Sequence, residues 1–144
     1  EGILSAGELN SRYEVMVENY FLNLEIEINL MLELLWTSIL PAALDSQKKY
    51  AKSIAKASEL LNSKQAFKGQ LEFLQNLASS IEEAISAAKE LEGAKSKLKN
   101  MDAASARTLK DLMEKLRHAG DRLELLTDDA VWPLPKYREL LFVI

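Results

Sequence analysis

Few residues in this sequence have the type and spacing that chemistry requires. The single histidine, His118, follows Glu114 by four residues and precedes Asp121 by three. These three side chains would share one helix face, so a surface site for a divalent cation is geometrically possible. Arg117 and Arg122 stand beside them, which is typical of a solvated ion-pair cluster. A ferritin-like two-metal site needs Glu-x-x-His on two helices, and one histidine cannot supply it. We therefore predict no metal site.

The remaining carboxylates give equally weak signals. Asp128 and Asp129 could bind a cation, but such a pair more often caps a helix end or forms a loop. A polar ridge at steps of four residues crosses an apolar stretch and consists of Glu25, Asn29, Glu33 and Thr37. This ridge could be a buried polar network, a groove between helices or a reactive carboxylate site. Nothing else converges on it, which disfavours the reactive carboxylate.

Several classes of site are excluded by composition. The chain of 144 residues has no cysteine, which excludes disulfides, Cys-ligated zinc, iron–sulfur clusters and thiol catalysis. Its five glycines are isolated, so no glycine-rich phosphate loop exists. No strand–turn–helix elbow surrounds any serine, as hydrolysis by a Ser/His/Asp triad would require. We predict no catalytic, cofactor-binding or metal-binding residues, and a structural or interaction role.

The charge pattern bears on partners. The net charge of −4 divides into −6 over residues 1–44, +4 over residues 45–118 and −2 over residues 119–144. Opposite net charges on successive segments favour the side-by-side packing of the helices that these segments form. A basic ridge of Lys48, Lys52 and Lys56, beside Lys49, is interpreted as a solvated helix face rather than a phosphate-tracking surface. We predict no nucleic-acid partner, since nucleic-acid binding favours a basic domain.

The sequence also disfavours a membrane. The longest unbroken apolar runs, Ile39–Leu44 and Leu140–Ile144, are shorter than the roughly 18 residues that a span requires. Amphipathic membrane helices carry Lys and Arg on their polar face, whereas residues 1–44 carry Arg12 alone. No secretion signal opens the chain. We predict a cytoplasmic protein with no membrane partner.

Hydrophobic periodicity predicts the elements that would position these residues. We expect one domain over residues 1–144: a first helix over 1–40, a second over 42–62, a third over 65–92, a fourth over 102–127 and a docked tail over 128–144. Ser5 and Glu8 have the spacing of a capping box at the start of the first helix. Pro41 should end or kink that helix near Leu40.

Residues 21–40 fit two interpretations. Their alternation resembles a strand, but no turn residues bound it and no partner strand exists, so we predict a helix. One arc of this helix carries Leu24, Ile28, Met31, Leu32, Leu35 and Ile39. A second ridge carries Leu22, Ile26, Leu30 and Leu34. The helix is therefore expected to be buried on two sides.

The third and fourth helices show the clearest periodicity, with apolar or small residues alternating at steps of four and three. The positions in the third helix are Phe67, Leu71, Leu74, Ala78, Ile81, Ile85 and Ala88. Those in the fourth are Ser105, Leu109, Leu112, Leu116, Ala119, Leu123 and Leu126. We expect the two helices to pack antiparallel along a shared seam. The predicted fold is an all-α, up-and-down antiparallel bundle of three to four long helices.

The last 17 residues depart from this regularity. Trp132-Pro133-Leu134-Pro135 cannot continue a helix, so an extended Trp-Pro tail is expected. The segment carries much apolar area for its length. It should dock on the bundle or on a neighbouring subunit, because otherwise a large apolar patch would face water.

These ends carry a family resemblance. Residues 128–142, DDAVWPLPKYRELLF, resemble the extreme C-terminus of type III glutamine synthetases, and residues 117–126, RHAGDRLELL, resemble the segment before it. Near the start, ELNSRYE at 8–14 and ILPAA at 39–43 are similar to family patterns. The middle, about residues 47–107, resembles the family only as generic amphipathic helix.

The resemblance implies a non-catalytic C-terminal helical domain cut from a longer subunit, and a chain that opens at Glu1 rather than Met agrees with such an excision. The parent would join ammonia to glutamate using ATP and Mg²⁺ or Mn²⁺. Its catalytic and nucleotide-binding residues would lie in preceding domains, so none is carried over to this chain, which alone should be inactive. Stacked hexameric rings imply a homo-oligomer and contacts with the catalytic domain of the same chain. The alternative is a stand-alone adaptor that binds a partner helix through residues 21–40.

Overall fold

The computed structural model describes residues 6–61, 64–96 and 103–136, and these form helices and a tail. The helices are α1 (Ala6–Leu34), the π-helical turn η1 (Leu35–Ile39), α2 (Leu40–Leu61), the 3₁₀ turn η2 (Lys64–Phe67), α3 (Lys68–Lys95) and α4 (Ala103–Leu126). The described ranges contain no strand, so the predicted all-α class is confirmed and the helical interpretation of residues 21–40 is correct. The capping residue Ser5 lies outside the described residues.

Pro41 does not separate two helices. The helical backbone continues from α1 through η1 into α2, and Pro41 is the second residue of α2. In η1 the Leu40 N–H donates to the Leu35 carbonyl, five residues back. A proline lacks an N–H and its ring crowds the preceding turn, and a π-helical turn accommodates this by widening the helix. The Thr37 hydroxyl donates to the Glu33 carbonyl at 2.6 Å, within the turn before the proline. Of the two outcomes expected at Pro41, an end or a kink near Leu40, the helix end does not occur.

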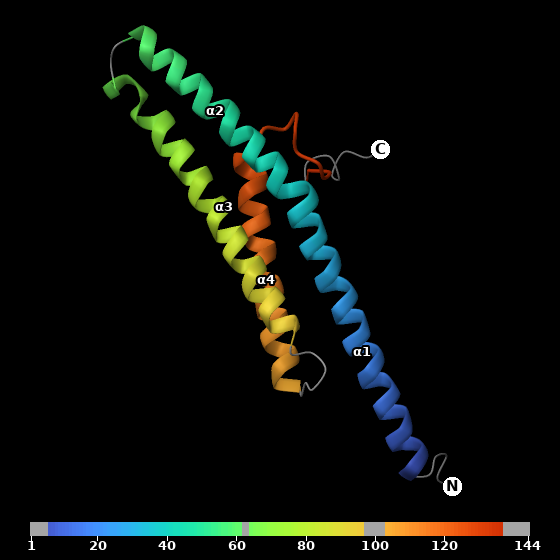
Figure 1. Ribbon diagram of the computed structural model, residues 1–144. Coiled ribbons are helices and arrows are strands. Elements are labelled where there is room, and N and C mark those ends of the chain that lie inside the picture. Colours follow the sequence, from blue (N-terminus) through green and yellow to red (C-terminus); the bar gives the residue numbers. More distant parts are fainter. Residues whose placement is uncertain (1–5, 62–63, 97–102, 137–144) are drawn as a thin grey trace.

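Three helical rods run up, down and up (Figure 1). The continuous rod α1–η1–α2 is the longest, α3 returns along it, and α4 runs antiparallel to α3. Helix α3 lies at the centre, because it contacts α4, α2 and α1. The N-terminal half of α1 extends beyond the other two rods at one end, and the α2–α3 hairpin extends beyond α4 at the other.

The core forms where the three rods overlap. Its fully covered side chains come from all of them and include Ile28, Leu35, Leu77, Leu91, Leu109 and Leu123. Burying an aliphatic side chain of this size contributes about 1.5–3 kcal/mol, so this stretch dominates the stability of the fold. Two ion pairs flank the α3–α4 contact, joining Lys115 to Glu90 at 2.6 Å and Arg122 to Glu83 at 2.9 Å.

The predicted seam of α4 is confirmed. Leu109, Leu116, Ala119 and Leu123 are at most 4% exposed, and the other predicted positions are partly buried. The predicted seam of α3 is only partly right. Its buried residues are Leu77, Ser80, Ile81, Ala84, Ala87, Ala88 and Leu91. Ala78 and Ile85 are only half-buried, and Leu71 is exposed. Helix α3 contacts α4, α2 and α1, so its buried face is wider than a seam for one neighbour. The centre of this buried face is rotated around the helix relative to the predicted seam.

The two predicted faces of residues 21–40 have different outcomes. The first arc is buried, with Leu24 at 3% and Ile28 at 0% exposed. The second ridge is mostly exposed: Leu22, Ile26 and Leu30 are 57%, 64% and 54% exposed, and Leu34 is half-buried. Both α3 and α4 pack on the same side of α1, so no described element reaches the opposite side. The expected burial on two sides is wrong for the chain by itself.

Candidate functional site

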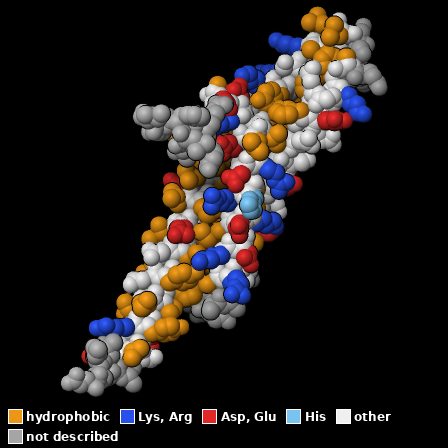
Figure 2. All heavy atoms as spheres, turned by 180° about the vertical axis from the view of Figure 1, so that it is seen from behind, with side chains coloured by type: hydrophobic (Ala, Val, Ile, Leu, Met, Phe, Trp, Pro, Cys, Tyr) orange, Lys and Arg blue, Asp and Glu red, His pale blue; other side chains and the backbone are white. Residues whose placement is uncertain are grey.

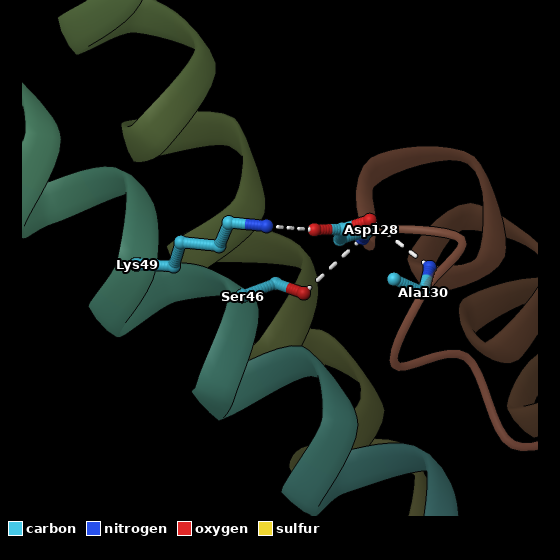
Figure 3. Close-up of polar contacts among 4 residues, drawn as sticks. All are labelled: Ser46, Lys49, Asp128 and Ala130. Atoms are coloured by element: carbon cyan, nitrogen blue, oxygen red, sulfur yellow. Dashed lines mark hydrogen bonds and ion pairs between the residues drawn. The ribbon is translucent and has the colours of Figure 1, made fainter.

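The most organised polar cluster outside the α3–α4 contact joins the tail to α2 (Figure 3). Lys49, on α2, forms an ion pair with the Asp128 carboxylate. The Asp128 N–H donates to the Ser46 hydroxyl at 3.1 Å, and Ser46 is 1% exposed. The other carboxylate oxygen accepts from the Ala130 N–H at 3.0 Å. Asp128 thus fastens the first turn of the tail to the second helix.

The electrostatics follow from this geometry. The hydrogen bond from Lys49 lowers the pKa of Asp128 below its ordinary value, and the Ala130 N–H acts in the same direction. Reciprocally, the hydrogen bond to Asp128 raises the pKa of Lys49. Both groups stay charged around neutral pH. A carboxylate held in its charged form by a lysine and a backbone N–H is a structural tie, whereas a general acid would need a raised pKa.

A second tie holds the tail to the end of α4. Lys136 donates to the Glu124 carbonyl at 3.0 Å and forms an ion pair with Asp129. Its ammonium lies 6.0 Å from the ring centroid of Trp132. Trp132 packs against the hydrophobic core. The described part of the tail therefore lies on the bundle, held by an aromatic anchor between two ion pairs.

Trp132 and Leu134 line a mostly apolar hollow of about 160 Å³ between the tail, α1 and α4. The hollow is also lined by Met31, Leu35 and Leu116, with Arg117, Asp121 and Glu124 among the polar residues around it. Within the described residues, the Trp132 indole N–H and the Thr127 hydroxyl are buried without a hydrogen-bond partner. The hollow can seat an apolar side chain, because apolar side chains make up most of its lining.

The structure places the predicted candidate residues on the surface. His118 lies 3.8 Å from Glu114 and 4.0 Å from Asp121, but all three side chains are at least 61% exposed. No group of three or more possible metal ligands occurs in the part of the chain that the structure describes. Asp128 and Asp129 lie at a helix end, as one of the two interpretations held.

The polar ridge of α1 and the basic ridge of α2 are also exposed. Glu25, Asn29, Glu33 and Thr37 are all exposed, so the ridge is not a buried network. Asn29 accepts a hydrogen bond from Lys95 and thereby joins α1 to the end of α3. Lys48, Lys52 and Lys56 face solvent, and Lys49 is the one member of the basic ridge that binds Asp128.

Sequence reasoning missed the residues that cross-link the helices. Three hydrogen bonds join segments that are at least 56 residues apart in the sequence. They connect Ser46 with Asp128, the Trp36 indole with Glu92 (to which it donates at 2.9 Å), and Lys95 with Asn29. A single serine or tryptophan on an amphipathic helix gives no pattern that identifies a distant partner. The Trp-Pro motif was the available signal that the tail is anchored.

Nearly the whole chain is similar to glutamine synthetases. The family model described as the glutamine synthetase C-terminal domain matches residues 1–58. The chain is 30% identical over 150 residues to a type-3 glutamine synthetase of Dictyostelium discoideum, and 30% identical over 152 residues to a glutamine synthetase of Bacteroides fragilis. The predicted resemblance to the C-terminal domain of type-3 glutamine synthetases is confirmed.

The extent of these matches is uneven. They cover 98% and 99% of this chain but only 20% and 21% of the two relatives, so the chain spans about one fifth of their length. A glutamine synthetase of Butyrivibrio fibrisolvens is 28% identical over 98% of the chain. The similarity to glutamine synthetases thus includes the middle helices, which resembled the family only generically. No solved structure matches the chain.

One helical stretch, Gly7–Leu61, is long and apolar enough by composition to cross a membrane. This is weak evidence, because core helices pass the same test, and a third of the apolar window is buried against the rest of the bundle. The stretch also contains the wall of the core formed by Leu24, Ile28 and Leu35.

Proposed function

We propose that the chain is the C-terminal helical domain of a glutamine synthetase, an ATP-dependent glutamate–ammonia ligase, and that it serves subunit packing rather than catalysis. The proposal is supported by similarity over nearly the whole of this chain to glutamine synthetases that are about five times as long. Two of these relatives are 30% identical to the chain. In this proposal ATP and Mg²⁺ or Mn²⁺ bind the preceding domains of the same subunit. The subunit is cytoplasmic and assembles as stacked hexameric rings.

The contacts of the described residues support a scaffolding role. The ion pairs at Asp128, Glu90 and Glu83 each join one helix or the tail to another helix. The exposed apolar surface, by contrast, is concentrated on α1. A domain with an internally fastened core and one uncovered apolar helix is suited to bind another protein surface.

The first test is the coding sequence upstream of Glu1. The proposal expects several hundred in-frame residues that contain a nucleotide site and metal-binding glutamates. A start codon directly before Glu1 would contradict it and favour the stand-alone adaptor. The adaptor has one observation in its favour, the exposed ridge of Leu22, Ile26 and Leu30.

The second test separates packing from catalysis in the full-length subunit. Removing residues 1–144 should reduce the mass of the assembly in light scattering, because a packing surface is lost. The 144-residue chain alone should form no glutamine from glutamate, ammonia, ATP and Mg²⁺. A truncated subunit that assembles like the full-length one, or glutamine formation by the purified chain, would show that the assigned role is wrong.

A further inference from the structure

The N-terminal half of α1 carries an apolar seam that the described residues leave mostly exposed. We call Leu9, Tyr13, Met16 and Tyr20 the α1 seam. These side chains are 58%, 66%, 71% and 40% exposed. The N-terminal end of α1 extends past the ends of α3 and α4 (Figure 1), and hydrophobic side chains gather at this end of the molecule in Figure 2. Tyr20 lies where α4 begins to contact α1, with the Lys110 ammonium 5.4 Å from its ring centroid.

The α1 seam adjoins the face of α1 that packs into the core of the same chain. Its steps of four, three and four residues lead directly to Leu24 and Ile28, which are 3% and 0% exposed in the core. At 100° per residue the two sets occupy adjoining sectors of the helix. Of these two adjoining sectors, the one in the C-terminal half of α1 is buried by α3 and α4, and the one in the N-terminal half is largely exposed. The exposed sector has the spacing that a neighbouring helix requires.

The charges around the α1 seam permit a second copy of the same helix. The positions that flank it are Asn10, Arg12, Val17 and Asn19, while the acids Glu8, Glu14 and Glu18 lie farther round the helix. An acidic helix normally repels its own copy, but here the interface edge carries amides, a valine and one arginine. Like-charge repulsion is therefore kept away from the contact.

We propose that the α1 seam pairs with the α1 seam of a second copy of this chain, in antiparallel orientation. Tyr13 of one copy then lies against Met16 of the other, and Leu9 against Tyr20. An antiparallel pair places the two bundles at opposite ends, where they do not collide, and opposes the two helix dipoles favourably. The contact has two-fold symmetry. It deepens the proposed packing role by naming the surface and the partner.

The pairing should be weak in the isolated chain. A standard stable interface buries about 800 Å² on each partner, and four side chains on one stripe provide less than that. Self-association is therefore expected at concentrations of roughly 10 µM to 1 mM. In a larger assembly, where other contacts hold the subunits together, the same pairing would be stronger because the two seams are held close to each other.

Sedimentation velocity on the 144-residue chain over this concentration range tests the pairing. The wild-type species of 16.2 kDa should shift toward twice that mass. Met16→Glu should weaken dimerisation at least tenfold, because a charge would be buried in the seam. Ser11→Glu is the matched control: it adds the same charge to the opposite side of the helix and should leave the dimer unchanged. A chain that stays monomeric throughout, or equal effects of both variants, would overturn the proposal.

Cysteine cross-linking tests the orientation, and the absence of native cysteine makes it clean. A mixture of the Tyr13→Cys and Met16→Cys variants should form a mixed disulfide faster than either variant alone under mild oxidation. Ser11→Cys should cross-link only at the background rate. Faster self-linking of Met16→Cys alone would indicate parallel helices and reject the proposed pairing. Circular dichroism should show unchanged helix content, because both substituted positions are more than half exposed.

A third variant locates the interface on α1. Ile26→Glu charges the second exposed ridge and should not affect self-association, although Ile26 is 64% exposed. If it abolished the dimer while Met16→Glu did not, the second ridge would be the interface and the proposal would fail. Such a failure would not affect the proposal that the chain is a domain of a glutamine synthetase. That proposal depends on the sequence similarity and is tested by the upstream coding sequence.

Discussion

Helix α4 and the N-terminal half of α1 carry apolar residues at the same alternating spacing, yet their surroundings differ. Leu109, Leu116 and Leu123 of α4 are at most 4% exposed, whereas Tyr13 and Met16 of α1 are 66% and 71% exposed. Helix α4 lies along the central helix α3, while the first half of α1 extends past its neighbours. Periodicity thus identifies the face of a helix that packs, but the lengths of the other helices decide whether the same chain covers that face.

Helix α4 and the N-terminal half of α1 should differ most in the free energy of unfolding that is lost when one seam residue in each is replaced by alanine. Leu123→Ala should lower the free energy of unfolding by about 2–5 kcal/mol, because it removes buried methyl groups and leaves a cavity. Met16→Ala should change it by less than about 0.5 kcal/mol in the monomer. Urea melts at a few micromolar protein, below the range of self-association, would measure both. Equal losses would mean that the two regions are equally covered and that the comparison is wrong.

The helices differ in how well the sequence predicts which of their faces are buried. The seam of α4 was predictable because it packs on one side, so one stripe describes it. The seam of α3 was predicted less well because neighbours on more than one side bury Ser80, Ala84 and Ala87, and small residues carry little hydrophobic signal. The burial of the ridge at Leu22, Ile26 and Leu30 was wrong because local periodicity carries no information on how many neighbours a helix has.

The candidate site was predictable only in part. The Trp-Pro motif indicated a tail that must dock, and Trp132 does pack on the core. The tie between Asp128 and Lys49 spans 79 residues and depends on where the rod α1–η1–α2 passes the end of α4. That crossing depends in turn on the π-helical turn at Pro41, which was expected to be an end or a kink. Long-range polar contacts of this kind follow from tertiary geometry and leave no local pattern.

A smaller effect is expected where the tail covers the bundle. Trp132 is half-buried against the core, so Trp132→Ala should destabilise the chain by about 1–3 kcal/mol, less than a fully buried aromatic would. Leu125→Ala, nearby on α4 but 83% exposed, is the matched control and should have almost no effect. Thermal unfolding followed by circular dichroism would compare them. Indistinguishable melting temperatures would show that the tail does not contribute to the core.

The tie between the tail and α2 should make part of the stability depend on pH. The pKa of Asp128 is lowered in the folded chain, so its contribution is present above the ordinary pKa of about 3.8 and is lost as the pH falls through the folded value. The pKa of Lys49 is raised above its ordinary value of 10.5, so the contribution is also lost as the pH rises through the folded value. The stability difference between wild type and Asp128→Asn should be constant from about pH 5 to 9 and shrink in acid.

Urea melts across the acidic range would measure this difference. Lys49→Met, which removes the other member of the ion pair, should also reduce the acid dependence, but less completely than Asp128→Asn, because the Ala130 N–H still lowers the pKa of Asp128. The pair Glu90–Lys115 also lowers a carboxyl pKa, but it is present in every variant and cancels in the subtraction. A difference that stays constant down to pH 2 would show that Asp128 and Lys49 do not interact in the folded chain.

The smallest expected effect lies at the boundary between the covered and uncovered parts of α1. The ammonium of Lys110, on α4, lies 5.4 Å from the ring centroid of Tyr20, the last residue of the α1 seam before the core begins. Lys110→Ala should cost well under 1 kcal/mol, because cation–π contacts at exposed sites contribute little. A double-mutant cycle with Tyr20→Leu would isolate the coupling. A coupling energy above 1 kcal/mol between Lys110 and Tyr20 would contradict this prediction. It would show that α4 covers α1 at Tyr20, and the boundary between the covered and uncovered parts of α1 would then lie closer to Met16.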